Sequence, residues 1–126
     1  RPTALVCIRL APAAPEDGDI TAGRTLTEAA RLINRVCRAE DFVGRLTRDT
    51  FIVLMSGAVA ADATFAARRI EGVIANTMFR TRGERNLYAV AAASAAIERT
   101  SGSRLDETIA AALARLNGVE PRTAER

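Results

Sequence analysis

The sequence predicts an α+β domain in which helices pack on an antiparallel sheet. Apolar runs typical of strands alternate with amphipathic stretches of helical spacing, in the order β-α-β-β-α-β-α. The chain has 126 residues, enough for one core, and 48% of them are hydrophobic although only four are Phe, one is Tyr and none is Trp. We therefore expect an Ala-rich aliphatic core in a ferredoxin-like βαββαβ arrangement, with a further helix at the C-terminus.

The first third of the chain predicts a strand, a loop and a helix. Thr3–Leu10 is apolar and typical of a central strand. Ala11–Asp19 holds two Pro, one Gly and three acids, which is typical of a loop. Thr25 and Glu28 have the spacing of a capping box, which predicts a helix starting there. Its apolar positions keep helical spacing: Leu26, Ala29, Ala30, Ile33, Val36 and Cys37.

The middle of the chain predicts a hairpin followed by a helix. Phe42–Leu46 and Phe51–Ser56 are two short strands joined by a polar four-residue turn. The second strand is apolar at every position from 51 to 55, so both of its faces are expected to be buried. Ala60–Met78 is expected to form one helix, with an inner side of Phe65, Ala66, Ile70, Val73, Ile74 and Met78.

The last third predicts a strand and a closing helix. Asn86–Ile97 is an Ala-rich strand, and Asp106–Asn117 is a helix for which Gly118 supplies the C-cap. Val119–Arg126 is expected to be a frayed polar tail, so that residues 1–118 form the domain. The first strand begins almost at Arg1, which leads us to expect that the chain is part of a larger protein.

Composition excludes several classes of function. The net charge of +3 is too small and too scattered to predict nucleic-acid binding, although all 18 basic residues are Arg, which suits phosphate and guanine. No apolar run is long enough for a membrane segment. Without His, and with Cys7 and Cys37 in separate apolar stretches, a zinc site or a His triad is excluded. Two buried free thiols indicate a cytoplasmic protein.

The most informative segment runs from Arg38 to Met55. An Arg-x-x-Asp motif, Arg38 and Asp41, ends the first predicted helix, and the turn of the hairpin then reads Thr47-Arg48-Asp49-Thr50-Phe51. This arrangement resembles the GGDEF domain of bacterial diguanylate cyclases. There the Arg-x-x-Asp motif is the inhibitory site for cyclic di-GMP, and the turn carries the signature Gly-Gly-Asp/Glu-Glu-Phe.

The resemblance implies a ligand site made of Arg38, Asp41 and Arg69. Arg69 lies 18 residues after Phe51, where the family has a further arginine of this site. The chemistry is suitable, because a guanidinium matches guanine O6 and N7 while a carboxylate accepts from N1–H and N2–H. A second arginine can hold phosphate or stack on the base.

The resemblance also implies that the catalytic signature is degenerate. Thr47 and Arg48 replace two glycines that make room for the nucleotide, Asp49 is retained, and Thr50 replaces an acid. The strand positions that hold the family's metal-binding acid match Cys7 and Arg9. Two further departures are Pro12–Asp19, which replaces the helix that recognises guanine, and Arg115, which stands for a phosphate-binding Lys. We expect no catalytic residues and no functional magnesium site.

The leading hypothesis is a catalytically inactive GGDEF domain that acts as a cyclic di-GMP receptor and signals to a protein partner or a second copy. The alternative is a dimerisation or protein-docking module that binds no nucleotide. A third reading, a residual enzyme or GTP binder, is opposed by the missing acids at positions 7, 9 and 50.

Overall fold

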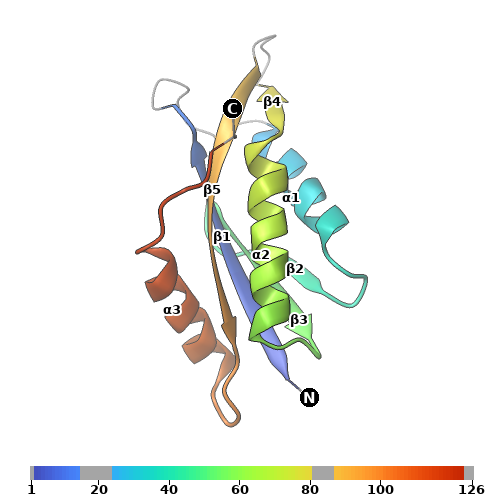
Figure 1. Cartoon of the computed structure of the whole chain (residues 1–126), viewed down its shortest axis with the longest axis vertical. Helices are drawn as coiled ribbons and strands as arrows, with labels where there is room; N and C mark the ends of the chain where they lie inside the picture. Colours follow the sequence, from blue (N-terminus) through green and yellow to red (C-terminus); the bar gives the residue numbers. More distant parts are fainter. Residues whose placement is uncertain (1, 15–23, 81–86, 124–126) are drawn as a thin grey trace.

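The computed structural model describes residues 2–14, 24–80 and 87–123. Within these ranges the chain forms an antiparallel sheet of the order β2-β3-β1-β5-β4 with three helices, and the predicted α+β class is confirmed (Figure 1). The elements are β1 (Thr3–Pro12), α1 (Thr25–Val36), β2 (Phe42–Arg45), β3 (Thr50–Ser56), α2 (Ala60–Ala75), β4 (Met78–Arg80), β5 (Leu87–Glu98) and α3 (Leu105–Leu116).

The central strand β1 is covered on both faces, which explains its unbroken apolar sequence. Helices α1 and α2 lie on one side of the sheet and α3 lies on the other (Figure 1). Alternate side chains of β1 therefore enter two cores. Ala4, Val6, Ile8 and Leu10 pack beneath α1 and α2, whereas Leu5 and Cys7 pack beneath α3.

Strands β3 and β5 flank β1 and repeat this pattern. In β3, Phe51, Val53 and Met55 face α1 and α2, Ile52 faces α3, and Leu54 is half-buried, so the predicted burial of both faces is confirmed. In β5 the apolar positions are mainly alanine. These small side chains form part of both cores, and α2 and α3 pack on the two faces of this strand.

The helix predicted for 60–78 is shorter than expected, and its inner side was partly wrong. It ends at Ala75, because Asn76 Nδ2 and Thr77 Oγ1 donate to the carbonyl oxygens of Gly72 and Val73 at 2.8 and 2.6 Å and satisfy the last turn. The following residues form β4, which pairs with β5. The inner side consists of Ala63, Ala67, Ile70 and Ile74, whereas Phe65, Val73 and Met78 are exposed.

Both predicted helix caps were wrong. Arg24 occupies the N-cap of α1 without a side-chain hydrogen bond to the helix, and Thr25 is instead a buried residue of the first turn. At the end of α3 the C-cap is Asn117, and Gly118 follows it with its N–H donating to Arg115 O at 3.1 Å. Among the described glycines only Gly57 and Gly102 have positive φ, so Gly118 does not form a left-handed cap.

The bounds of several other predicted segments also differ from those in the structure. Strand β1 continues through Pro12, so the predicted loop of residues 11–19 starts later, and its part from residue 15 onward lies outside the described residues. Asn86 lies outside them as well. In the predicted tail, Arg122 exchanges two backbone hydrogen bonds of 3.1 and 2.7 Å with Ala92 of β5. Among the described helices none is long and apolar enough to cross a membrane.

Candidate functional site

The three residues predicted to bind a ligand line one pocket. The pocket has a volume of about 220 Å³ and lies where the end of α1, strand β3 and helix α2 meet. Arg38 and Asp41 come from the segment between α1 and β2, and Arg69 comes from α2. The lining is completed by Val36, Cys37, Met55, Asp62, Phe65 and Ala66.

Arg38 and Asp41 are joined to each other by hydrogen bonds and a salt bridge. The Arg38 backbone N–H donates to Asp41 Oδ2 at 2.8 Å, and Arg38 Nη2 lies 3.0 Å from Asp41 Oδ1. The same Nη2 donates to Ser56 O at 3.2 Å, which holds the guanidinium against the end of β3. The turn is closed by the Asp41 N–H, which donates to Arg38 O at 3.0 Å.

The pair differs in exposure, and this determines what a ligand could reach. The Asp41 side chain is 1% exposed, whereas the Arg38 side chain is 46% exposed. The hydrogen bond to Asp41 raises the pKa of the Arg38 guanidinium above its ordinary value. The guanidinium covers the carboxylate. A donor group of a ligand therefore reaches Asp41 only after the Arg38 side chain has moved aside.

Phe65 and Asp62 belong to the pocket and were missed as site residues. Phe65 lies one turn before Arg69 on α2, and the Arg69 guanidinium lies 5.9 Å from the centre of its ring. Asp62 accepts a hydrogen bond from the Val59 N–H at 3.2 Å and so caps the start of α2. The i, i+4 spacing of Phe65 and Arg69 could have predicted that the two side chains lie on the same side of α2.

The charges of the pocket balance. Arg38 and Arg69 contribute two positive charges, and Asp41 and Asp62 contribute two negative charges. Long-range attraction of an anion is accordingly weak at this pocket. Recognition here has to come from directed hydrogen bonds and from stacking on the exposed Phe65 ring.

The residues that match the family signature in sequence, Thr47 to Phe51, lie in the β2–β3 turn and at the start of β3, outside this pocket. Asp49 Oδ1 accepts hydrogen bonds from Thr47 Oγ1 and Thr50 Oγ1, each at 3.1 Å. Thr50 is buried, begins β3 and pairs with Arg9 of β1, while Phe51 is a core residue. The carbonyl oxygens of residues 47 and 48 accept from the Arg45 guanidinium.

At the turn, Asp49 supplies a carboxylate, whereas the two matching positions of β1 do not. Cys7 is a buried thiol, and Arg9 donates to Asn117 Oδ1 at 3.0 Å, so neither position next to the turn offers a carboxylate. Within the described ranges no group of three or more His, Cys, Asp or Glu residues could hold a metal ion. Arg115 is also directed elsewhere, since its Nη1 donates to Ala96 O of β5 at 2.9 Å.

The two thiols are expected to react slowly with alkylating agents. Burial raises the pKa of Cys7 to about 11, and burial together with the Asp41 carboxylate raises the pKa of Cys37 to about 11. Cys7 is buried as predicted, whereas Cys37 is only half-buried and lines the pocket. Because the thiolate is the nucleophile, two pKa units lower the reactive fraction roughly 100-fold at neutral pH.

The measurement is the rate of iodoacetamide labelling of each cysteine in the folded protein, with the urea-unfolded protein as control. Labelling should accelerate as the pH rises toward 11, since the folded-state pKa lies above the unfolded one. Labelling of folded Cys37 at the rate of the unfolded chain at neutral pH would contradict the burial described here.

A comparison with protein families identifies the domain. The family model described as "Diguanylate cyclase, GGDEF domain" matches residues 17–125. The chain belongs to the GGDEF family. A search of curated proteins found no match.

Solved structures of GGDEF proteins share the fold. Diguanylate cyclase SiaD of Pseudomonas aeruginosa, solved with its activator SiaC, is 21% identical with a TM-score of 0.76; the match covers 93% of this chain and 48% of SiaD. The active GGEEF domain of a Vibrio cholerae diguanylate cyclase is 17% identical with a TM-score of 0.70; the match covers 94% of this chain and 80% of the Vibrio chain. The GGDEF domain of DgcB from Caulobacter crescentus, solved with c-di-GMP, is 19% identical with a TM-score of 0.66; the match covers 92% of this chain and 70% of the DgcB chain.

The prediction that this domain is not an enzyme is wrong. The family that it matches is defined as a diguanylate cyclase domain, and the fold is that of an active GGEEF domain. Loss of the glycines and of one acid from the signature turn led to that prediction. Those substitutions change the local chemistry of the turn without moving the chain out of an enzyme family.

Proposed function

We propose that this GGDEF domain binds cyclic di-GMP in the pocket lined by Arg38, Asp41 and Arg69. The proposal depends above all on one observation: three side chains separated by up to 31 positions in the sequence line a single pocket. The family membership supports a ligand of this class. DgcB, which has the same fold, is described in complex with c-di-GMP.

In the proposed complex, Arg38 leaves Asp41 and binds the O6 and N7 edge of one guanine. Its Nε and Nη2 make the hydrogen bonds to Asp41 and Ser56 in the free protein, so the guanidinium already points along the pocket wall. Asp41 then accepts from guanine N1–H and N2–H. A buried carboxylate is a strong acceptor for these donors, because little water competes with them.

Arg69 and Phe65 complete the site. Arg69 is one helical turn from Phe65, and in the described part of the chain it has no ion-pair partner. It is therefore available to hold a ligand phosphate. The Phe65 ring is 65% exposed and offers an apolar surface beside that arginine, on which a base can stack.

The size of the pocket limits how the ligand is held. A volume of about 220 Å³ lies below the roughly 300–1,000 Å³ of sites that enclose a drug-sized molecule. One guanine fits inside, and the rest of the dinucleotide lies over the exposed side chains at the rim. A second copy of the domain or a protein partner can cover that part; SiaD, for comparison, is described with an activator protein. The two free cysteines support a reducing, cytoplasmic setting.

The test is a calorimetric titration of the domain with cyclic di-GMP, for which we expect a micromolar or lower dissociation constant. Cyclic di-AMP is the matched control, because it keeps the phosphates but lacks the O6 acceptor and the N1–H and N2–H donors. It should bind at least tenfold more weakly. Affinity should depend little on salt, since the charges of the pocket cancel.

Equal affinity for the two dinucleotides would contradict recognition of guanine by Arg38 and Asp41. Absence of binding at ligand concentrations of about 100 μM would favour the alternative, a docking module that binds no nucleotide, and measurement of its oligomeric state would then be the next step.

A further inference from the structure

The outer edge of β5 is paired over only part of its length. Strand β4 pairs with residues 87–89, and Arg122 exchanges two backbone hydrogen bonds with Ala92. Within the described ranges no other backbone pairs with this edge between Ala92 and Glu98. Because β1 takes the opposite edge along that whole stretch, a length of open sheet edge remains that can accept a further strand.

Ser94 and Ala96 present free backbone groups at this edge. The backbone groups of alternate residues point to the same edge of a strand, so these two residues point outward together with Ala92. Ala96 O accepts from Arg115 Nη1 at 2.9 Å, in keeping with that direction. In the described part of the chain, nothing pairs with the Ser94 N–H, the Ser94 carbonyl oxygen or the Ala96 N–H. Ser94 is only 8% exposed, so its backbone groups lie where such groups normally have a partner.

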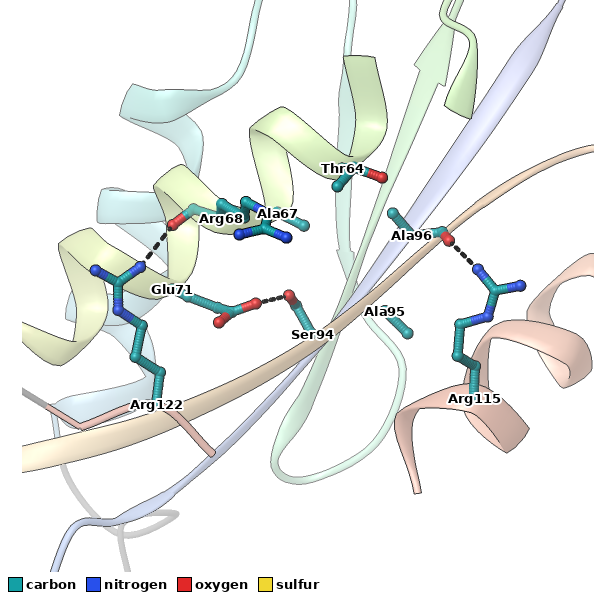
Figure 2. A pocket seen from close by; sticks show the side chains of 9 residues that line it. All are labelled: Thr64, Ala67, Arg68, Glu71, Ser94, Ala95, Ala96, Arg115 and Arg122. Atoms are coloured by element: carbon teal, nitrogen blue, oxygen red, sulfur yellow. Dashed lines mark hydrogen bonds between the residues drawn. The ribbon is translucent and has the colours of Figure 1, made fainter. Parts of the chain in front are cut away.

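A groove runs beside these free groups (Figure 2). Its volume is about 400 Å³, and it is lined by β5 residues 94–96, by one side of α2 and by arginines of α3 and of the segment after it. Ala67 of α2 and the two alanines at 95 and 96 have short side chains that leave room for an incoming chain. The Ser94 hydroxyl donates to Glu71 of α2 and so does not satisfy the free backbone groups.

Arg68 of α2 gives this groove a preference for negative charge. Arg68 is exposed, and in the described ranges no carboxylate lies within 4.0 Å of its guanidinium. The carboxylate of Glu71, which also lines the groove, accepts from Ser94. Residues directly opposite each other in a ladder place their side chains on the same face of the sheet, and the Ser94 side chain lies on the α2 face. An acidic side chain opposite Ser94 therefore lies on the same face as Arg68.

We propose that the outer edge of β5 binds an extended segment of a partner protein as an added antiparallel strand, with an acidic side chain opposite Ser94. The Arg122 bridge shows that extended chain pairs with this edge in the antiparallel sense, and the added segment continues that line toward Glu98. Its main chain pairs with the free groups of Ser94 and Ala96, and one of its N–H groups replaces the Arg115 guanidinium at Ala96 O.

Two observations favour a partner segment of this chemistry. A second copy that paired through the same edge would bring two Arg68 side chains together on one face of the joined sheet, and like charges opposite each other are destabilising. No residue of the pocket of Arg38, Asp41 and Arg69 lines the groove, so this proposal stands apart from the proposed cyclic di-GMP site.

The test uses the synthetic peptide acetyl-Thr-Val-Thr-Val-Glu-amide as the probe, titrated into the intact domain and followed by NMR. Antiparallel pairing with residues 98–94 places its Glu opposite Ser94 and ends the peptide before the Arg122 bridge. At saturation the amide signals of Ser94 and Ala96 should shift, and their hydrogen exchange should slow at least tenfold, because the peptide supplies the missing acceptors.

N-methylated peptides show whether the main chain carries the binding. Methylation of the Glu nitrogen removes the N–H that donates to the Ser94 carbonyl oxygen and should abolish binding. The matched control is methylation of the preceding Val nitrogen, whose N–H points away from β5, and this peptide should still bind. Binding that survives methylation of the Glu nitrogen would overturn the proposal.

Arg68→Glu tests the preference for negative charge. It should weaken binding of the Glu peptide at least tenfold and strengthen binding of a peptide with Lys in place of Glu, since the paired charges are exchanged. Arg31→Glu makes the same change on the exposed surface of α1, outside the groove, and should alter neither affinity. Equal effects of the two variants, no shift at millimolar peptide, or a dimer of the domain that protects the Ser94 amide without peptide would each contradict the proposed partner.

Discussion

Replacing Arg38 by alanine is expected to weaken cyclic di-GMP binding at least tenfold. The change removes the guanidinium that we assign to the guanine O6 and N7 edge. It leaves the fold intact, because the Arg38 side chain is about half exposed and the bond from its backbone N–H to Asp41 Oδ2, at 2.8 Å, does not depend on the side chain. Calorimetric titration measures the effect, and the thermal unfolding midpoint checks the fold.

Two further variants show whether the geometry or only the charge of Arg38 matters. Arg38→Lys keeps the charge but lacks the planar fork, so it should recover only part of the affinity. Arg48→Ala removes an arginine from the signature turn, outside the pocket, and should change binding little. If Arg38→Ala and Arg48→Ala bind equally well, the assignment of the pocket to cyclic di-GMP is wrong.

Replacing Phe79 by alanine is expected to lower the free energy of unfolding by about 3–5 kcal/mol. Phe79 belongs to β4 and is completely buried in the core beneath α1 and α2. Its removal costs the transfer of a large apolar side chain and leaves a cavity that the surrounding aliphatic residues fill only partly. Urea unfolding followed by circular dichroism gives the free energy directly.

Phe65→Ala is the matched control for Phe79→Ala. It deletes the same atoms from a ring that is 65% exposed, so the loss of stability should stay below about 1 kcal/mol. Equal destabilisation by the two substitutions would mean that Phe65 packs inward, as the helical spacing alone predicted. The comparison therefore tests the orientation of α2 and the presence of β4 together.

The order and type of most elements could be predicted because they follow from local patterns. Residues 3–10 and 51–55 are apolar at nearly every position, which predicts strands covered on both faces, and both cores are found there. The boundaries were less predictable. Asn76 and Thr77 end α2 through hydrogen bonds to the preceding turn, a choice that apolar spacing does not encode.

The sequence predicted the members of the candidate site but not their arrangement. The spacing of Arg38, Asp41 and Arg69 and the resemblance to GGDEF domains placed them at one site, and the structure puts them in one pocket. Their state was not predictable: Arg38 covers Asp41 because Ser56, at the end of β3, also accepts from its guanidinium. That acceptor comes from a segment 18 residues away.

The sequence by itself determined the α+β class, the order of helices and strands along the chain, and the family. The first two depend on local periodicity, and the family depends on a short motif. Tertiary structure decided which side of α2 faces the sheet, and hence that Phe65 is exposed beside Arg69, while the neighbouring Arg68 lines a different pocket together with Arg115. The physical reason is that a helical period fixes which residues share a side but leaves open what that side meets, which depends on packing between distant segments.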